Sequence, residues 1–150
     1  MTATDPEIRE LLPPHTGLAY EAMRALRTHL ESEEKFVERV DTVQRQQGYR
    51  IVAVFEDDGE QATAVAGFRV LDNLAWGNAL YVDDLSTHPD HRRRGHGARL
   101  MQWLIGEAQR LGCDQFHLDS GVGPEREDAH RLYFNSGLRI TSYHFGRAAR

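Results

Sequence analysis

The sequence predicts an α/β fold built on a mixed β-sheet, and three observations support this. A strand-like run, Asn78–Thr87, leads through a basic turn into a stretch whose apolar residues recur at helical spacing and end before Gly112. A further apolar run, Asp114–Asp119, follows, and a strand–helix–strand unit of this kind pairs its strands in parallel. Upstream, two apolar runs flank Asp57-Asp58-Gly59, a turn signal that predicts an antiparallel hairpin.

The N-terminal half is expected to hold three strands and two helices. Thr16 is the expected N-cap of a helix over Leu18–Leu30, and Ser32 is the expected N-cap of a second helix that Gly48 ends. The three strands are expected at Glu7–Leu12, Tyr49–Phe55 and Ala62–Leu71.

The C-terminal part is expected to add one helix and one strand. Pro124 suits the first turn of a helix that runs to about Asn135 and is closed by Gly137. Leu138–Phe145 is the expected last strand, and its exposed position would permit a homodimer as well as a monomer. No repeat or linker interrupts the chain, so we expect a single domain over residues 1–150.

Composition excludes several classes of protein. The net charge is −5, whereas general nucleic-acid binding requires a basic domain, so no nucleic-acid partner is expected. No apolar run is long enough to span a bilayer, and the N-terminus lacks a signal pattern, so no membrane partner is expected. The single cysteine, Cys113, cannot form an internal disulfide, which favours a cytoplasmic location.

The basic turn between the central strand and its helix has the features of an anion site. Its sequence is His91-Arg92-Arg93-Arg94-Gly95-His96-Gly97. Glycines let backbone N–H groups approach a ligand, and a helix N-terminus attracts negative charge. The turn therefore predicts a phosphate ligand, although a solvated arginine cluster remains the alternative for the three guanidinium groups.

Two other kinds of site are disfavoured at the same turn. His88, His91 and His96 lie near Asp90 without an established ligand spacing, so no metal is expected. The glycines also lack the remaining residues of a dinucleotide fingerprint or of a P-loop.

Two blocks of the sequence resemble the GCN5-related N-acetyltransferases (GNAT). Arg92-x-x-Gly95-x-Gly97, preceded by Leu85–Asp90, is similar to the acyl-CoA signature of that family. Ala129–Leu138 is similar to its A-x-x-L-Y-x-x-x-G-F helix, with Leu138 in place of the commoner Phe. The resemblance implies a GNAT fold, with a central mixed sheet flanked on both faces by helices, and acetyl-CoA as co-substrate.

The resemblance also implies which residues bind the co-substrate. The turn would hold the diphosphate, a bulge in the central strand would separate it from its parallel neighbour, and the pantetheine arm would enter the gap. A backbone N–H near Leu85 would polarise the thioester carbonyl. The implied cofactor-binding residues are Leu85, Ser86, Thr87, Arg92, Arg93, Arg94, Gly95, His96, Gly97, Ala98 and Asn135.

Acyl transfer also needs a base and an acid. An alkylamine has a pKa of about 10, so a carboxylate must help to remove its proton. Asp83 and Asp84 directly precede Leu85, and adjacent strand residues should point to opposite faces unless the bulge intervenes. The resemblance implies Asp83 as the first candidate and Asp84 as the second. A structural role for both remains the alternative. Tyr133 is the expected proton donor to the thiolate, with packing as its alternative.

Together these residues predict an N-acetyltransferase that works by direct transfer in a ternary complex. The acceptor would be a primary amine of a small molecule or peptide. A cationic acceptor would suit the acidic N-terminal half, with a pocket that includes Glu31, Glu33, Glu34 and the Trp76 loop. The alternatives are a protein N-terminal or lysine acetyltransferase and a non-catalytic acyl-CoA-binding or sensor domain.

Overall fold

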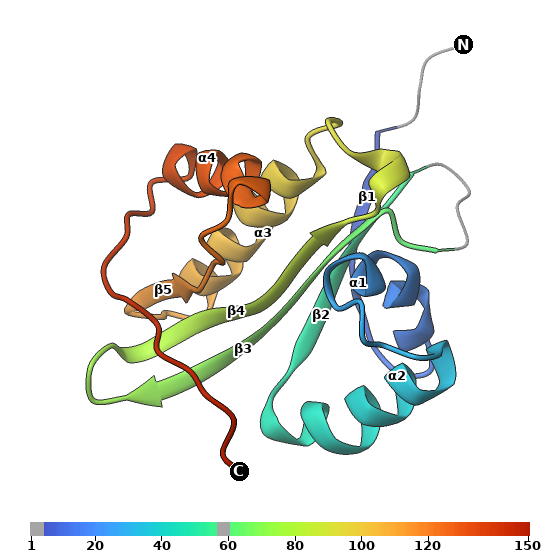
Figure 1. The fold of residues 1–150 in the computed structure, drawn as a ribbon, viewed down its shortest axis with the longest axis horizontal. Coiled ribbons are helices and arrows are strands. Elements are labelled where there is room, and N and C mark those ends of the chain that lie inside the picture. The colour runs from blue at the N-terminus through green and yellow to red at the C-terminus, as the bar shows by residue number, and fades with distance from the viewer. Residues whose placement is uncertain (1–4, 57–60) are drawn as a thin grey trace. The chain divides into compact units, whose positions relative to one another are not determined.

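The computed structural model describes residues 5–56 and 61–150, and the chain forms two compact units (Figure 1). The first unit ends at Leu118 and the second is Asp119–Arg150. The strands, all in the first unit, are β1 Glu7–Leu11, β2 Arg50–Phe55, β3 Ala64–Asn73, β4 Gly77–Thr87 and β5 Gln115–Leu118. The α-helices are α1 Tyr20–Leu26, α2 Glu33–Arg39 and α3 His96–Arg110 in the first unit, and α4 Glu127–Asn135 in the second.

Shorter helical turns complete the order of elements. They are η1 Thr16–Ala19, the π-helical η2 Val40–Gln44, η3 Arg45–Gln47, η4 Pro89–His91 and η5 Pro124–Arg126.

The sheet is mixed, as the sequence predicted. Its strands lie in the order β1-β2-β3-β4-β5, and neighbours from β1 to β4 are antiparallel. β5 is parallel to β4, so the strand–helix–strand prediction is confirmed. β2 and β3 form the predicted antiparallel pair, while the expected turn residues Asp57–Gly59 lie outside the described residues.

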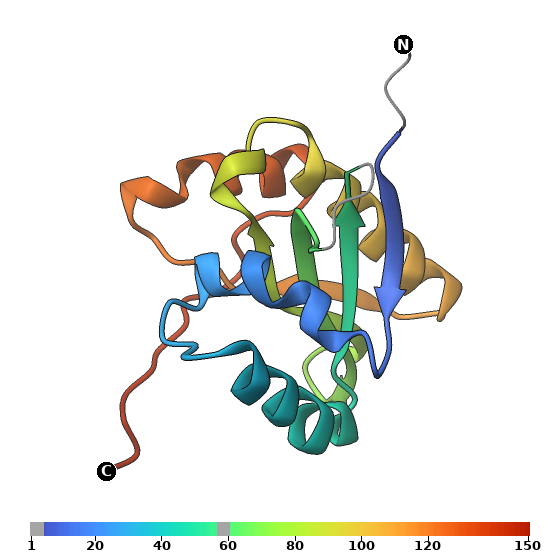
Figure 2. The ribbon, with the colours of Figure 1, turned by 90° about the vertical axis from the view of Figure 1, so that its right-hand side faces the viewer.

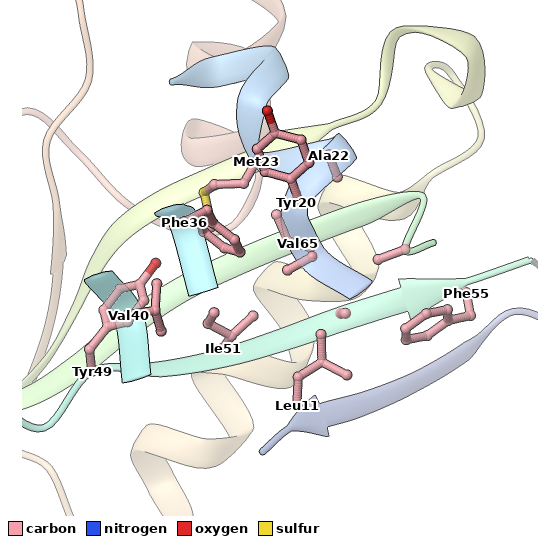
Figure 3. Close-up of a cluster of buried hydrophobic side chains, with 13 residues drawn as sticks. Leu11, Tyr20, Ala22, Met23, Phe36, Val40, Tyr49, Ile51, Phe55 and Val65 are labelled. Atoms are coloured by element: carbon pink, nitrogen blue, oxygen red, sulfur yellow. The ribbon is translucent and has the colours of Figure 1, made fainter. Parts of the chain in front are cut away.

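Helices cover both faces of the sheet in the first unit (Figure 2). On one face, side chains of α1 and α2 such as Met23 and Phe36 pack with Ile51 of β2 and Val65 of β3 (Figure 3). On the other face, Phe68 of β3 meets Trp103 of α3 edge to face, with ring centroids 5.7 Å apart. Burial on both faces explains the nearly continuous apolar run of β2.

The two expected helix caps have different outcomes. Ser32 accepts a hydrogen bond from the backbone N–H of Lys35, which confirms it as the N-cap of α2. The Thr16 prediction is wrong, because its hydroxyl instead donates to Asp41 at 2.7 Å. The first helix is also shorter than expected: α1 ends at Leu26, and Arg27 leaves the helical conformation and donates to Asp84.

The second unit begins with η5 and α4, and it corrects one prediction. Pro124 lies in the first helical turn and Gly137 follows α4 with a φ of 86°, as expected. The predicted strand Leu138–Phe145 is wrong, because this segment forms no helix or strand. A strand needs a hydrogen-bonded neighbour, and no described strand pairs with these residues.

Among the described residues, no helix is both long and apolar enough to cross a membrane.

A buried ion cluster connects β1, β2 and α3. Arg50 donates to both carboxylate oxygens of Glu10 at 2.8 Å and to Glu107 at 2.6 Å. Arg110 donates to both oxygens of Glu107, which is 7% exposed. Hydrogen bonds from Arg110 and Arg50 outweigh the effect of burial and lower the pKa of Glu107 from 4.5 to about 2.

We expect Glu107→Gln to lower the free energy of unfolding by about 1–3 kcal/mol at pH 7, because charged hydrogen bonds are lost. The pKa of Glu107 is lowered in the folded state, so its contribution is complete above about pH 4.5 and disappears as the pH falls towards 2. Urea unfolding at pH 7 and pH 3 measures the difference. Glu38→Gln, an exposed site on α2, is the control, and an equal loss at both pH values would contradict the assignment.

Candidate active site

β4 contains a bulge at Asp83. Gly67 of β3 pairs with Asp84, and the next residue, Phe68, pairs with Val82, so Asp83 is the extra residue. The bulge implied by the resemblance is therefore confirmed. An extra residue breaks the alternation of side chains along a strand and increases its local bend.

The bulge brings the two adjacent carboxylates together. Asp84 accepts from the Tyr49 hydroxyl at 2.6 Å and from Arg27 Nε at 2.7 Å. Asp83 accepts from Arg69 at 2.5 Å, and the Arg69 guanidinium lies 5.5 Å from the centre of the Tyr49 ring. Both carboxylates thus lie on the α1 side of the sheet, and the default expectation of opposite faces does not hold here.

Tyr49 supports this arrangement from β2's N-terminal end. It is buried, and burial followed by the charge of Asp84 raises its pKa, so its hydroxyl remains a donor. A Cβ on Gly67 would lie 1.8 Å from that hydroxyl, so only glycine leaves room for the ring. Sequence reasoning missed Tyr49, Arg27 and Arg69, because they are 14 to 57 residues from their partners and belong to no motif.

Beyond the bulge, β4 has no strand neighbour on the β5 side. β5 pairs with β4 only over Ala79–Val82, and it ends at Leu118 opposite Val82. On that side, the backbone of residues 83–87 therefore pairs with no described strand. The side chain of Ser86 is bonded to α1, because its hydroxyl donates to the carbonyl of Ala22 at 2.7 Å. Ser86 is also the strand partner of Val65 on β3, and alternation along the strand leaves the backbone groups of Leu85 and Thr87 on the β5 side.

The basic turn, residues 91–97, has two left-handed positions. Arg93 has a φ of 64° and Gly95 a φ of 79°. Gly95 is the N-cap of α3, which begins at His96. Left-handed residues next to a helix start turn successive N–H groups to one side, which forms an anion-binding concavity.

The first-turn amides of α3 remain available. The N–H groups of His96, Gly97 and Ala98 have no acceptor within the helix, and no side chain among the described residues caps them. Arg92 and Arg93 have exposed side chains. The turn therefore presents amides and positive charge together.

Arg94 and His96 are held differently from Arg92 and Arg93. Arg94 Nη1 donates to Glu56 at 2.6 Å, and His96 Nε2 lies 2.5 Å from the other oxygen of Glu56. His96 is 2% exposed, so its ring is not open to a ligand. Glu56 was not singled out from the sequence, because it lies 40 residues from His96 and outside both motifs.

The second unit carries Tyr133 and Asn135 on α4. Burial raises the pKa of Tyr133, and the charge of Arg126 and a hydrogen bond from it oppose that rise. The phenol is therefore protonated at neutral pH. Asn135 is the last residue of α4, and its side chain is exposed.

The residues of the expected acceptor pocket have partners of their own. Glu31 pairs with Lys35, and Glu33 accepts from Gln61 at 3.1 Å. Trp76 stacks on His117 with ring centroids 3.7 Å apart. Within the described parts of the chain, no group of three or more His, Cys, Asp or Glu residues could hold a metal ion.

Comparison with known proteins gives the family. The model of the acetyltransferase (GNAT) family matches residues 16–137. The N-acetyltransferase YhdJ of Bacillus subtilis, itself uncharacterised, is 31% identical over 128 residues, which cover 85% of this chain and 87% of the relative.

Solved structures share the fold at low sequence identity. A Trypanosoma brucei acetyltransferase has a TM-score of 0.78 at 19% identity, over 96% of this chain and 99% of its own. An aminoglycoside N-acetyltransferase in complex with CoA has a TM-score of 0.72 at 15% identity, over 97% and 95% of the two chains.

The extent of the family match and the YhdJ relationship agree with the fold and with both sequence blocks. The family uses acetyl-CoA as its co-substrate. The chain therefore belongs to the GNAT acetyltransferase family and is an N-acetyltransferase.

Proposed function

We propose that this enzyme transfers the acetyl group of acetyl-CoA directly to a primary amine of a small molecule or peptide, within a ternary complex. The observation that carries the proposal is the set of uncapped amides at the start of α3, directly after a turn with two left-handed residues. Backbone amides at a helix N-terminus are a natural site for a diphosphate.

The open segment of β4 supports the placement of the pantetheine arm. The arm contains amides, which can add to an unpaired strand edge as a peptide would. Residues 83–87 offer such an edge, because β5 ends opposite Val82. In this proposal, the backbone of Leu85 and Thr87 faces the arm, Ser86 lies between them, and a backbone N–H near Leu85 polarises the thioester carbonyl.

For the amine, we propose Asp83 as the base, acting directly or through water. Its two oxygens accept from one arginine, Arg69, and a carboxylate has about four lone-pair sites, so acceptor capacity remains. Asp84 instead joins three segments, through Tyr49 directly before β2 and Arg27 after α1. Asp84 is therefore assigned the positioning role.

Tyr133 is proposed as the acid that protonates the departing thiolate. A phenol with a raised pKa keeps its proton at neutral pH, so the proton is available to the sulfur as the C–S bond breaks and negative charge develops on it. The positive charge of Arg126 then stabilises the phenolate that is left. Asn135 is retained as a proposed cofactor contact.

Two alternatives concern the acceptor and the chemistry. The amine could belong to a protein N-terminus or lysine, and assays with peptides and small amines side by side separate these cases. A domain that only binds acyl-CoA would show no turnover of the thioester with any amine.

Gly95→Ala should weaken acetyl-CoA binding about tenfold, because an L-residue at a φ of 79° is strained and a Cβ would lie 3.2 Å from Arg99. Arg93→Gly is the matched variant, because glycine adopts the same left-handed conformation without cost, and only the side-chain charge is lost. Calorimetric titration with acetyl-CoA measures both. Equal losses in the two variants would contradict a role for the turn's backbone.

Tyr133→Phe should lower kcat by roughly 10²–10⁴-fold, the usual contribution of a general acid, while the Kd of acetyl-CoA stays the same. Release of free thiol during amine acetylation measures kcat, and calorimetry measures Kd. Unchanged turnover would mean that Tyr133 only packs.

Asp83→Asn and Asp84→Asn form a matched pair, in which the first should reduce turnover and the second should reduce stability. Asp83→Asn should reduce kcat at least about 100-fold with little change in melting temperature, as expected for a lost base. Asp84→Asn should lower stability by about 1–3 kcal/mol, because it weakens the hydrogen bonds that the buried Tyr49 hydroxyl and the partly exposed Arg27 donate to the charged carboxylate. Full activity in Asp83→Asn would place the base elsewhere.

A further inference from the structure

We propose that Glu56 is the positioning residue of the basic turn: its carboxylate holds three side chains of the turn so that the backbone amides stay aimed at the diphosphate. This inference rests on the proposed function, because it takes the turn to be the diphosphate site. Glu56 follows β2 directly and belongs to neither sequence block of the family.

The carboxylate of Glu56 bonds to the turn at three places. Oε1 lies 2.5 Å from Nε2 of His96, the first residue of α3. Oε2 lies 3.0 Å from Nδ1 of His91 in η4 and 2.6 Å from Nη1 of Arg94. These partners lie on both sides of Arg93, so one side chain from β2's end fixes the two halves of the turn.

Arg99 of α3 also bonds to the turn. Its Nη1 donates to the carbonyl of Arg94 at 2.6 Å and lies 3.4 Å from Nδ1 of His96. We assign Nδ1 of His96 as the acceptor and Nε2–H as the donor to Glu56, since this neutral tautomer satisfies both neighbours. His96 is thus bonded on both ring nitrogens and its ring is fixed in the interior.

The charge of Glu56 is compatible with an anionic ligand nearby. Burial raises the pKa of Glu56, but hydrogen bonds from His96 and His91 and the charge of Arg94 lower it further, so the net shift is downward. The carboxylate is therefore ionised at neutral pH, and Arg94 neutralises it. The exposed guanidinium groups of Arg92 and Arg93 are left to face the diphosphate.

The left-handed conformation of Arg93 explains why such a support is needed. A non-glycine residue at a φ of 64° is strained and persists only where its surroundings fix it. Glu56 supplies that constraint through His91 and Arg94, the residues two before and one after Arg93. Without it, Arg93 can relax, and the amides of the turn lose their common direction.

The test is Glu56→Gln, which keeps the shape of the side chain and removes its charge. The KM and Kd for acetyl-CoA should rise about tenfold, as expected for lost charged hydrogen bonds, while kcat changes by less than about twofold. With S-acetylpantetheine, a donor without the diphosphate, kcat/KM should stay the same. Glu38→Gln, the same change at an exposed site on α2, should alter neither donor.

A double variant separates positioning from general support of the fold. In an Arg93→Gly background, Glu56→Gln should weaken acetyl-CoA binding by much less than the tenfold expected in the wild type, because glycine needs no support at this φ. Additive losses, or an equal loss of activity with both donors, would overturn the proposal. So would tighter binding in Glu56→Gln, since that result would mean that Glu56 merely withholds Arg94 from the diphosphate.

The CoA titrations also distinguish this inference from the proposed function. If the wild-type protein binds CoA but acetylates no amine, the acceptor proposal fails, and the titrations of Glu56→Gln still decide the role of Glu56. If the wild-type protein does not bind CoA, both proposals fail.

Discussion

One extra residue in β4 sets the geometry of the candidate site. The bulge at Asp83 turns two consecutive carboxylates to the same side of the sheet, where Arg69, Arg27 and Tyr49 receive them. At the same point β5 stops pairing with β4. The local bend of a bulge accounts for both effects, because it breaks the side-chain alternation and directs the strand away from a straight neighbour. The acid pair and the open strand edge thus have one structural cause.

The basic turn is held in place by the side chain of a residue that follows another strand. Its backbone is strained at Arg93 and open at the start of α3, which alone would make it mobile. Glu56 directly follows the buried strand β2 and connects the turn to it. A site that binds a flexible co-substrate benefits from such preorganisation, because less conformational entropy is lost on binding.

Local signals in the sequence predicted much of the fold, but they could not predict contacts between residues far apart in the chain. Ser32, Gly48 and Gly112 act through neighbours within a few residues, and their roles as helix ends could be predicted. The bonds from Tyr49 to Asp84 and from Glu56 to His96 span 35 and 40 residues and follow no periodicity. Leu138–Phe145 has the composition of a strand, but composition cannot supply the neighbour that a strand requires.

The pairing of acids with arginine bears on how an acceptor would be recognised. In the first unit, Asp83, Asp84, Glu56 and Glu107 each bond to at least one arginine, and Arg27 bridges the Asp84 carboxylate and the Asp83 carbonyl at once. The planar guanidinium suits such bridging better than the single ammonium group of lysine. These carboxylates are neutralised by their partners, so the net charge of −5 does not by itself create an attraction for cations at the bulge. Selection of the amine at this position would then depend on shape and directed hydrogen bonds, which discriminate between neighbouring amines more sharply than long-range charge does.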